Sequence, residues 1–379
     1  TIPDTKHASR DALPAACRRG YTIRDNPMDL AQDKAVAQIV ARLATGGAGP
    51  VRVEGTWGSF ARLLTAHVAK TLHRPVLHVC PHLDDADRAF DDLKTFGAPH
   101  VELLAAWEGE EELADATDET RAERLRLVSL VSRESYLVSR DASDETRDTS
   151  DVVIAAPVQA LCQPVPKPAA LAAGSLRLEK DQAVEPDAVV EWLVNNSFER
   201  VDAIDLPGQF ARRGGIVDIY APLLRSTGIP STSSGQALPV THGRDARATG
   251  LQSQAIRIEF FGDTVESIRL IDLDTQRSTV EIEVLSIMAA TAGSQEGQRE
   301  LFTNILPPET IVVFEEPADV QEVASVYLAR AEKAERLYGW SDVHASVAGL
   351  TQLHICRFAA GEPAECIQVD VKSIQQFER

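Results

Sequence analysis

Hydrophobic positions in the first 160 residues alternate between two spacings. Short apolar runs predict strands at 51–53, 75–80, 101–104 and 151–156. Apolar residues at helical spacing predict helices from Asp29 to Leu43, Ser59 to Leu72, Asp84 to Phe96 and Thr120 to Ser132. Strands that alternate with helices are typical of βαβ units, so this part predicts an α/β fold with a parallel sheet.

The middle of the chain has a different pattern. Pro207-Gly208 and Gly214-Gly215 are turn signals, and the apolar run at 216–220 after them predicts a strand. Residues 256–259 alternate apolar and charged side chains, and Gly262-Asp263 separates this run from a second strand at 265–272. A period of two on both sides of a Gly-Asp turn predicts an antiparallel hairpin. With an amphipathic helix at 186–197, the middle segment is expected to be α+β.

Three segments follow from these patterns. The first covers 1–166 and ends in a proline-rich crossover, the second covers 167–278, and the third, 279–379, returns to α/β character. In the third we expect strands at 280–287 and 310–314, a long helix from Pro317 to Tyr338, and two closing strands. Within the second, residues 226–250 are rich in Ser, Thr, Gly and Pro and are interpreted as a disordered insertion.

Two blocks of the middle segment carry a resemblance. PGQFARRGGIVDIY (207–220) and IRIEFFGDTVESIRLIDLDTQRS (256–278) resemble the module shared by the excision-repair protein UvrB and the bacterial transcription-repair coupling factors. The ending at 272–278 is more similar to the coupling factors. The resemblance implies that 279–379 rejoins 1–166, so that one P-loop-NTPase-like domain is split by the inserted α+β domain. It also implies that the inserted domain is a docking domain for the protein UvrA.

The resemblance supplies candidate partner-binding residues for UvrA. Arg200 matches an arginine near the start of the motif, and Arg213 matches the arginine before the glycine. A further arginine of UvrB corresponds to Ala211 here, with Arg212 beside it. We therefore predict that the partner-binding set is Arg200, Phe210, Arg212 and Arg213. On a rigid hairpin, arginines can recognise carboxylates with two parallel hydrogen bonds. The alternative is that these arginines are solvated, or pair with aspartates of their own domain.

The turn Gly55-Thr56-Trp57-Gly58-Ser59 follows the first strand and precedes a helix, where a phosphate-binding loop would lie. A working loop needs a lysine for the β- and γ-phosphates and a Ser/Thr hydroxyl for magnesium. Aligned on Gly58, those positions hold Ser59 and Phe60. Gly55, Gly58 and Ser59 are therefore interpreted as a degenerate phosphate loop. We expect no catalytic residue and no cofactor in this chain, whereas UvrB keeps a complete loop.

His78, Cys80 and His82 alternate along a strand in the way that metal ligands can. No fourth ligand is evident from the sequence. The pattern is interpreted as an ordinary sheet strand, and no metal site is predicted.

Composition narrows the class of partner. The formal charge is −19 and aromatic residues make up 5% of the chain, so we expect a poor stand-alone binder of DNA and a protein partner instead. The five cysteines form no CxxC pair, which fits a reducing cytoplasm. No run is long enough for a membrane span. The chain begins at Thr1 without a methionine, which is consistent with a fragment.

These observations lead to one hypothesis and two alternatives. The hypothesis is the N-terminal, UvrB-like module of a coupling factor, which recruits UvrA to stalled RNA polymerase for transcription-coupled nucleotide excision repair. RNA polymerase, DNA, ATP and magnesium would be bound by downstream portions, which in the family include an ATP-driven translocase. The alternatives are a nucleotide-binding α/β enzyme that uses Gly55–Ser59 and a truncated UvrB. The latter would need a tyrosine-rich DNA-clamping hairpin, and no tyrosine lies between residues 22 and 135.

Overall fold

The computed structural model describes residues 30–46, 49–107, 119–132, 152–227, 251–288, 297–358, 366–369 and 371. The predicted insertion at 226–250 lies outside these residues, except that 226 and 227 end a strand.

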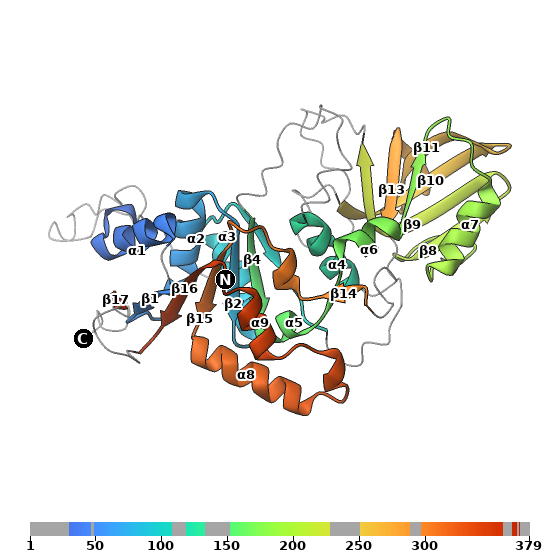
Figure 1. The fold of residues 1–379 in the computed structure, drawn as a ribbon. Helices are drawn as coiled ribbons and strands as arrows, with labels where there is room; N and C mark the ends of the chain where they lie inside the picture. Colours follow the sequence, from blue (N-terminus) through green and yellow to red (C-terminus); the bar gives the residue numbers. More distant parts are fainter. Residues whose placement is uncertain are drawn as a thin grey trace, which may run out of the picture.

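The first of the two main sheets is a parallel sheet of seven strands (Figure 1). Its strand order is β17-β1-β16-β15-β2-β4-β3, and every neighbouring pair is parallel. The strands are β1 (Val51–Glu54), β2 (Val76–Cys80), β3 (His100–Leu103), β4 (Val152–Pro157), β15 (Ile311–Glu315), β16 (Thr351–Cys356) and β17 (Cys366–Gln368). The predicted α/β class with a parallel sheet is confirmed. The sheet combines strands from before residue 160 and after residue 310, although the segment boundaries predicted above stay a prediction.

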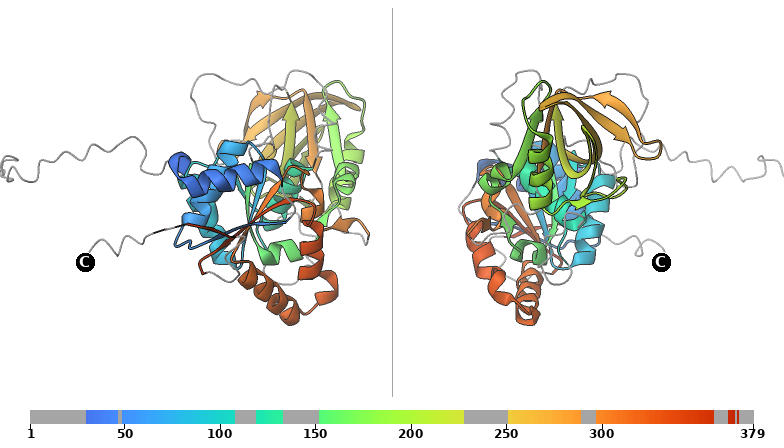
Figure 2. Two further views of the ribbon diagram at one scale, coloured as in Figure 1. Left: turned by 60° about the vertical axis from the view of Figure 1, so that its left-hand side comes forward. Right: turned by 90° about the vertical axis from the view of Figure 1, so that its right-hand side faces the viewer.

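Helices cover both faces of this sheet (Figure 2). On one face lie α1 (Lys34–Thr45), α2 (Phe60–Leu72) and α3 (Leu83–Thr95). On the other lie α4 (Glu119–Val131), α5 (Val158–Cys162), α8 (Pro317–Arg330) and α9 (Trp340–Ser346). Side chains along β2 alternate between the two cores, as a strand buried on both faces requires. None of the helices in the described part of the chain has the length and apolarity to cross a bilayer.

The middle of the chain forms a second sheet of eight strands, beside the first (Figure 1). These are β6 (Ser175–Glu179), β7 (Glu199–Arg200), β8 (Gln209–Arg213), β9 (Ile216–Thr227), β10 (Leu251–Phe261), β11 (Thr264–Asp272), β12 (Arg277–Glu281) and β13 (Val284–Met288). The predicted hairpin is present, since β10 and β11 pair antiparallel around Gly262-Asp263. An isolated bridge from Ala183 to Thr264 brings the chain after β6 against β11, so the sheet curls around an inner core. Helix α7 (Pro186–Asn195) packs into that core through Val189 and Leu193.

Short elements join the two sheets. Strand β5 (Val165–Pro166) pairs with β14 (Arg299–Glu300), and α6 (Pro168–Ala173) follows β5. Leu171 of α6 and Met288 of β13 are buried in one core cluster with residues of the parallel sheet. The remaining short elements are 3-10 turns at Leu30–Gln32, Phe302–Ile305 and Ala334–Arg336.

Two sequence-based boundaries were wrong. The single strand expected at 280–287 is two strands, because β12 pairs with β11 whereas β13 pairs with β6 and β9. The helix expected from Pro317 to Tyr338 ends at Arg330, since Ala331 is extended with φ −68° and ψ 130°.

Candidate protein-interaction site

The tips of two hairpins lie against each other in the middle sheet. The β8–β9 turn is Gly214-Gly215, where Gly214 has φ +64°. The Phe260 amide donates to the Gly215 carbonyl at 2.8 Å. A Cβ on Gly215 would lie 2.9 Å from the Phe260 carbonyl oxygen, so the close approach of the two tips requires glycine. This contact holds the neighbouring arginines of β8 in a defined position.

Arg212 and Arg213 point to opposite faces of the sheet, because successive side chains of a strand alternate. Arg212 lies on the inner, α7-covered face and forms an ion pair with Asp187 of α7. Arg213 is exposed on the outer face, and its Nη2 donates to the Asp202 carbonyl at 3.1 Å. The two arginines expected to act together therefore differ: one is used within its own domain and the other faces solvent.

Arg200 and Phe210 are neighbours on β7 and β8 but differ in burial. Arg200 is exposed, whereas Phe210 has no exposed surface and packs in the inner core with Val217 and Ile219. The expectation that Phe210 contacts a partner directly is therefore wrong, because a fully buried ring has no surface to offer. Its burial fixes β8 on the core instead.

The alternative that these arginines pair with aspartates of their own domain holds for Arg212, through Asp187. Asp218 is buried and pairs with Arg257, a residue that the sequence analysis did not single out. The alternation at 256–259 places Arg257 on the outer face, but its partner depends on the register between β9 and β10. Arg213 contacts only a backbone oxygen of Asp202 among the described residues.

The Gly55–Ser59 turn is packed against two strands rather than open. A Cβ on Gly55 would lie 2.5 Å from the Val369 carbonyl oxygen, and the Val369 amide donates to the Glu54 carbonyl at 3.0 Å. The Thr56 amide and hydroxyl both donate to the Cys356 carbonyl, at 3.4 and 3.1 Å. One backbone donor of the turn, the Thr56 amide, is thus already used. With Ser59 in place of the lysine, these residues do not fit a nucleoside triphosphate and magnesium.

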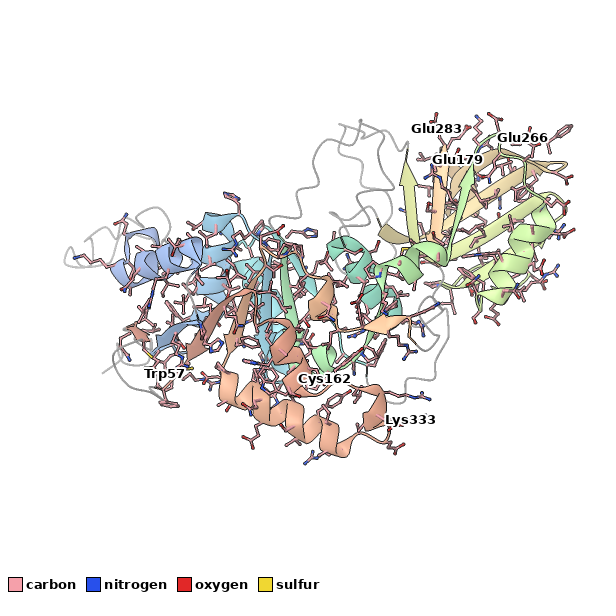
Figure 3. The ribbon with its side chains drawn as sticks, in the orientation of Figure 1. Trp57, Cys162, Glu179, Glu266, Glu283 and Lys333 are labelled. Carbon is pink, nitrogen blue, oxygen red and sulfur yellow. The ribbon has the colours of Figure 1, made fainter. Side chains whose placement is uncertain are left out.

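Trp57 within this turn is half exposed, and its ring meets Phe358 edge-on with 5.2 Å between the centroids. Figure 3 shows Trp57 at the end of the parallel sheet remote from the middle sheet, where Glu179, Glu266 and Glu283 are labelled. The degenerate loop and the arginines of β8 therefore belong to separate parts of the molecule.

His78 and Cys80 lie near Glu315 of the neighbouring strand β15. His78 Nε2 and Cys80 Sγ are 3.0 and 3.8 Å from Glu315 Oε2, and all three donor atoms lie within 4.8 Å of one another. His82 is not part of this group. Arg62 of α2 also pairs with Glu315, with Nε 3.4 Å from the same oxygen.

The charges of this cluster favour an internal ion-pair network. Burial opposes ionisation of Glu315, but the hydrogen bond from His78 and the charge of Arg62 hold the pKa of its carboxyl below the usual value. Burial and the Glu315 charge raise the pKa of the Cys80 thiol well above its usual value, which keeps the sulfur protonated. A carboxylate already neutralised by a guanidinium, beside a neutral thiol, is a poor ligand set for a cation.

A cavity of about 540 Å³ lies beside α8, apart from the Gly55 turn. Its wall carries Asp319 and Glu322 together with Arg330 and His82, so its charged groups are mixed in sign and do not single out a polyphosphate. It gives no support to nucleotide binding.

Comparisons with known proteins agree with the resemblance of the middle segment. Residues 176–228 and 245–292 match the family described as the UvrB interaction domain. The chain is 26% identical over 290 residues to a transcription-repair-coupling factor of Bacillus subtilis. The matched region is 75% of this chain and 20% of that protein. It is 25% identical over 234 residues to the transcription-repair-coupling factor of Escherichia coli, which covers 62% of this chain and 17% of that protein. A solved structure of Bacteroides Pif1 bound to ssDNA has 11% identity, 91% and 93% coverage and a TM-score of 0.15, which is too low to bear on the fold.

The similarity to transcription-repair-coupling factors expected from the two sequence blocks is thus confirmed. The chain spans about a fifth of the length of these relatives.

Proposed function

We propose that this chain, as a relative of transcription-repair-coupling factors with a UvrB interaction domain, is a UvrB-like module that recruits UvrA to stalled RNA polymerase. The observation that carries the proposal is the position of the UvrB interaction match, which covers the curled sheet with its exposed Arg200 and Arg213. In this proposal the module supplies a docking surface and performs no chemistry of its own.

The parallel-sheet part supports a binding role rather than an enzymatic one. Its Gly55 turn has lost the lysine and is closed by Val369 and Cys356, so a nucleotide-binding enzyme is not favoured. ATP, magnesium, DNA and RNA polymerase would be bound by other portions of a longer protein. A module with this function acts where transcription takes place, in the bacterial cytoplasm.

The acidic net charge of the chain is the reason for proposing individual exposed arginines as the contacts to the partner. The chain carries 57 acidic and 38 basic residues, so a general attraction for an acidic partner is excluded. Recognition must come from individual side chains at fixed positions, and arginine on a rigid hairpin can form two parallel hydrogen bonds with a carboxylate. We propose Arg213 as the main contact and Arg200 as a second. Arg212 acts indirectly, through its ion pair with Asp187.

A titration of purified UvrA with the whole chain tests the proposal. Arg213→Glu is expected to weaken binding by about tenfold, which corresponds to about 1.4 kcal/mol. Arg177→Glu is the matched control, since Arg177 is an exposed arginine on β6 of the same sheet and pairs only locally with Glu179. Failure of the unaltered chain to bind UvrA, or equal weakening by both substitutions, would refute the proposed function.

A further inference from the structure

Phe261 is the most exposed large apolar side chain in the described part of the middle sheet. It is 80% exposed and immediately precedes the Gly262-Asp263 turn between β10 and β11. Single exposed apolar residues are common on protein surfaces, so exposure alone assigns no role. A role for Phe261 is indicated instead by the residues that share its face and by the contacts that fix its turn.

The face on which Phe261 lies follows from the register. Phe260 pairs with Val265, and both are buried in the inner core, so Phe261 and its partner Thr264 lie on the outer face. Arg213 lies on that face too, since it pairs with Ile216 and Ile216 pairs with Glu259. Phe261 and Arg213 therefore lie on one face, at the same end of β10 and β8, the two strands that flank β9.

The tip that carries Phe261 is held in place. The Phe260 amide donates to Gly215, and the absence of a Cβ on Gly215 lets the two turns touch. On the other side, the Val184 amide donates to the Asp263 carbonyl at 2.7 Å. An aromatic ring on a fixed turn loses little conformational entropy when it is buried by a partner, and such rings are common anchors of interfaces together with arginine.

Both acidic and basic side chains lie around Phe261, so the surface does not repel partners of one particular charge. Asp263 and Glu266 are exposed near the turn, and Arg269 lies 3.6 Å from Glu259 on the outer face. Among the described residues, Phe261 and Arg213 are both exposed on this face.

We propose that Phe261 is the apolar anchor of the docking face that carries Arg213. The occupant is the partner of the proposed function, UvrA, through an apolar pocket with a carboxylate beside it. The inference rests on the proposed function and adds to it a specificity-determining residue that neither the sequence analysis nor the arginine pattern assigned. The arginine would select the charge, and the ring would contribute most of the buried apolar area.

The experiment measures the affinity of the whole chain for UvrA with three substitutions at Phe261 and Phe358. Phe261→Ala is expected to weaken binding by tenfold or more, and Phe261→Trp to keep it within about threefold, because an aromatic ring remains. Phe358→Ala is the matched control, since Phe358 is 67% exposed but lies in the parallel-sheet part, and it should leave the affinity unchanged. Unfolding midpoints should be equal for the unaltered chain and both Phe261 variants, because that ring is 80% exposed; Phe358→Ala also removes the contact with Trp57, so its midpoint is measured separately.

The two proposals fail in different ways. If Arg213→Glu weakens binding while Phe261→Ala stays within twofold of the unaltered chain, the anchor is refuted and the proposed function stands. If Phe261→Trp binds as weakly as Phe261→Ala, the ring is not an anchor and the inference is likewise refuted. If the unaltered chain does not bind UvrA, the proposed function itself is refuted.

Discussion

Arg257 on β10 and Asp218 on β9 form two parallel hydrogen bonds across the middle sheet, with Nε–Oδ1 and Nη2–Oδ2 distances of 2.7 and 2.9 Å. The two residues are direct partners in the strand register. Asp218 is 2% exposed, so its charge depends on Arg257 for compensation. The pair lies on the outer face next to the row that carries Arg213.

Removal of one partner of this pair should destabilise the fold. Arg257→Met leaves a buried carboxylate without its cation and is expected to lower the free energy of unfolding by about 3–5 kcal/mol. The double substitution Asp218→Val with Arg257→Val should recover much of the loss, since no buried charge remains. Urea unfolding measures both. A double variant as unstable as the single one would contradict the ion-pair explanation.

Glu102 on β3 should contribute stability that depends on pH. Burial opposes its ionisation, but hydrogen bonds from Arg126 and His100 hold its pKa at about 2, against an ordinary value of 4.5. The folded protein therefore favours the ionised carboxylate, and this stability is complete above pH 4.5 and is lost as the pH falls toward 2.

The variant Glu102→Gln separates this contribution from the rest of the acid titration. It should be less stable than the unaltered chain at pH 7, and the difference in free energy of unfolding should shrink between pH 4.5 and pH 2. Urea unfolding at a series of pH values provides the measurement. A difference that stays constant with pH would show that Glu102 does not titrate in this range.

Gly215→Ala should disturb the two hairpin tips. The new Cβ would lie 2.9 Å from the Phe260 carbonyl, so the turns must separate, at a cost of about 1–3 kcal/mol. Gly349→Ala is the control, because no atom lies within 4 Å of its added Cβ and its φ is not positive. Thermal unfolding compares the two. Equal midpoints would mean that the contact between the tips contributes nothing to stability.

Repair of the phosphate-loop sequence should not restore nucleotide binding. Ser59→Lys with Phe60→Thr supplies the missing side chains, but Thr56 still donates to Cys356 and Val369 still lies against Gly55. Calorimetric titration with ATP and magnesium is expected to show no saturable binding for either the unaltered chain or the double variant. Micromolar binding by the unaltered chain would revive the nucleotide-enzyme alternative.

Local patterns in the sequence were sufficient for much of the fold. Strands and helices in alternation predicted the parallel sheet, and the period of two around Gly262-Asp263 predicted the β10–β11 hairpin. The missing lysine at Ser59 predicted a phosphate loop without function, which stays a prediction; the turn itself packs against Val369 and Cys356. These features depend on neighbouring residues, whose spacing determines which side chains share a face of a helix or strand.

The composition of the candidate site depended on contacts between distant residues. Alternation placed Phe210 and Arg212 on one face of β8, but only the packing of α7 made that face the inner one. Glu315 meets His78 across 237 positions, and Thr56 meets Cys356 across 300. Strand register and helix cover are set by the whole core rather than by local spacing. Tertiary structure therefore decided that Phe210 is buried, that Arg212 is paired, and that Arg213 and Phe261 share an open face.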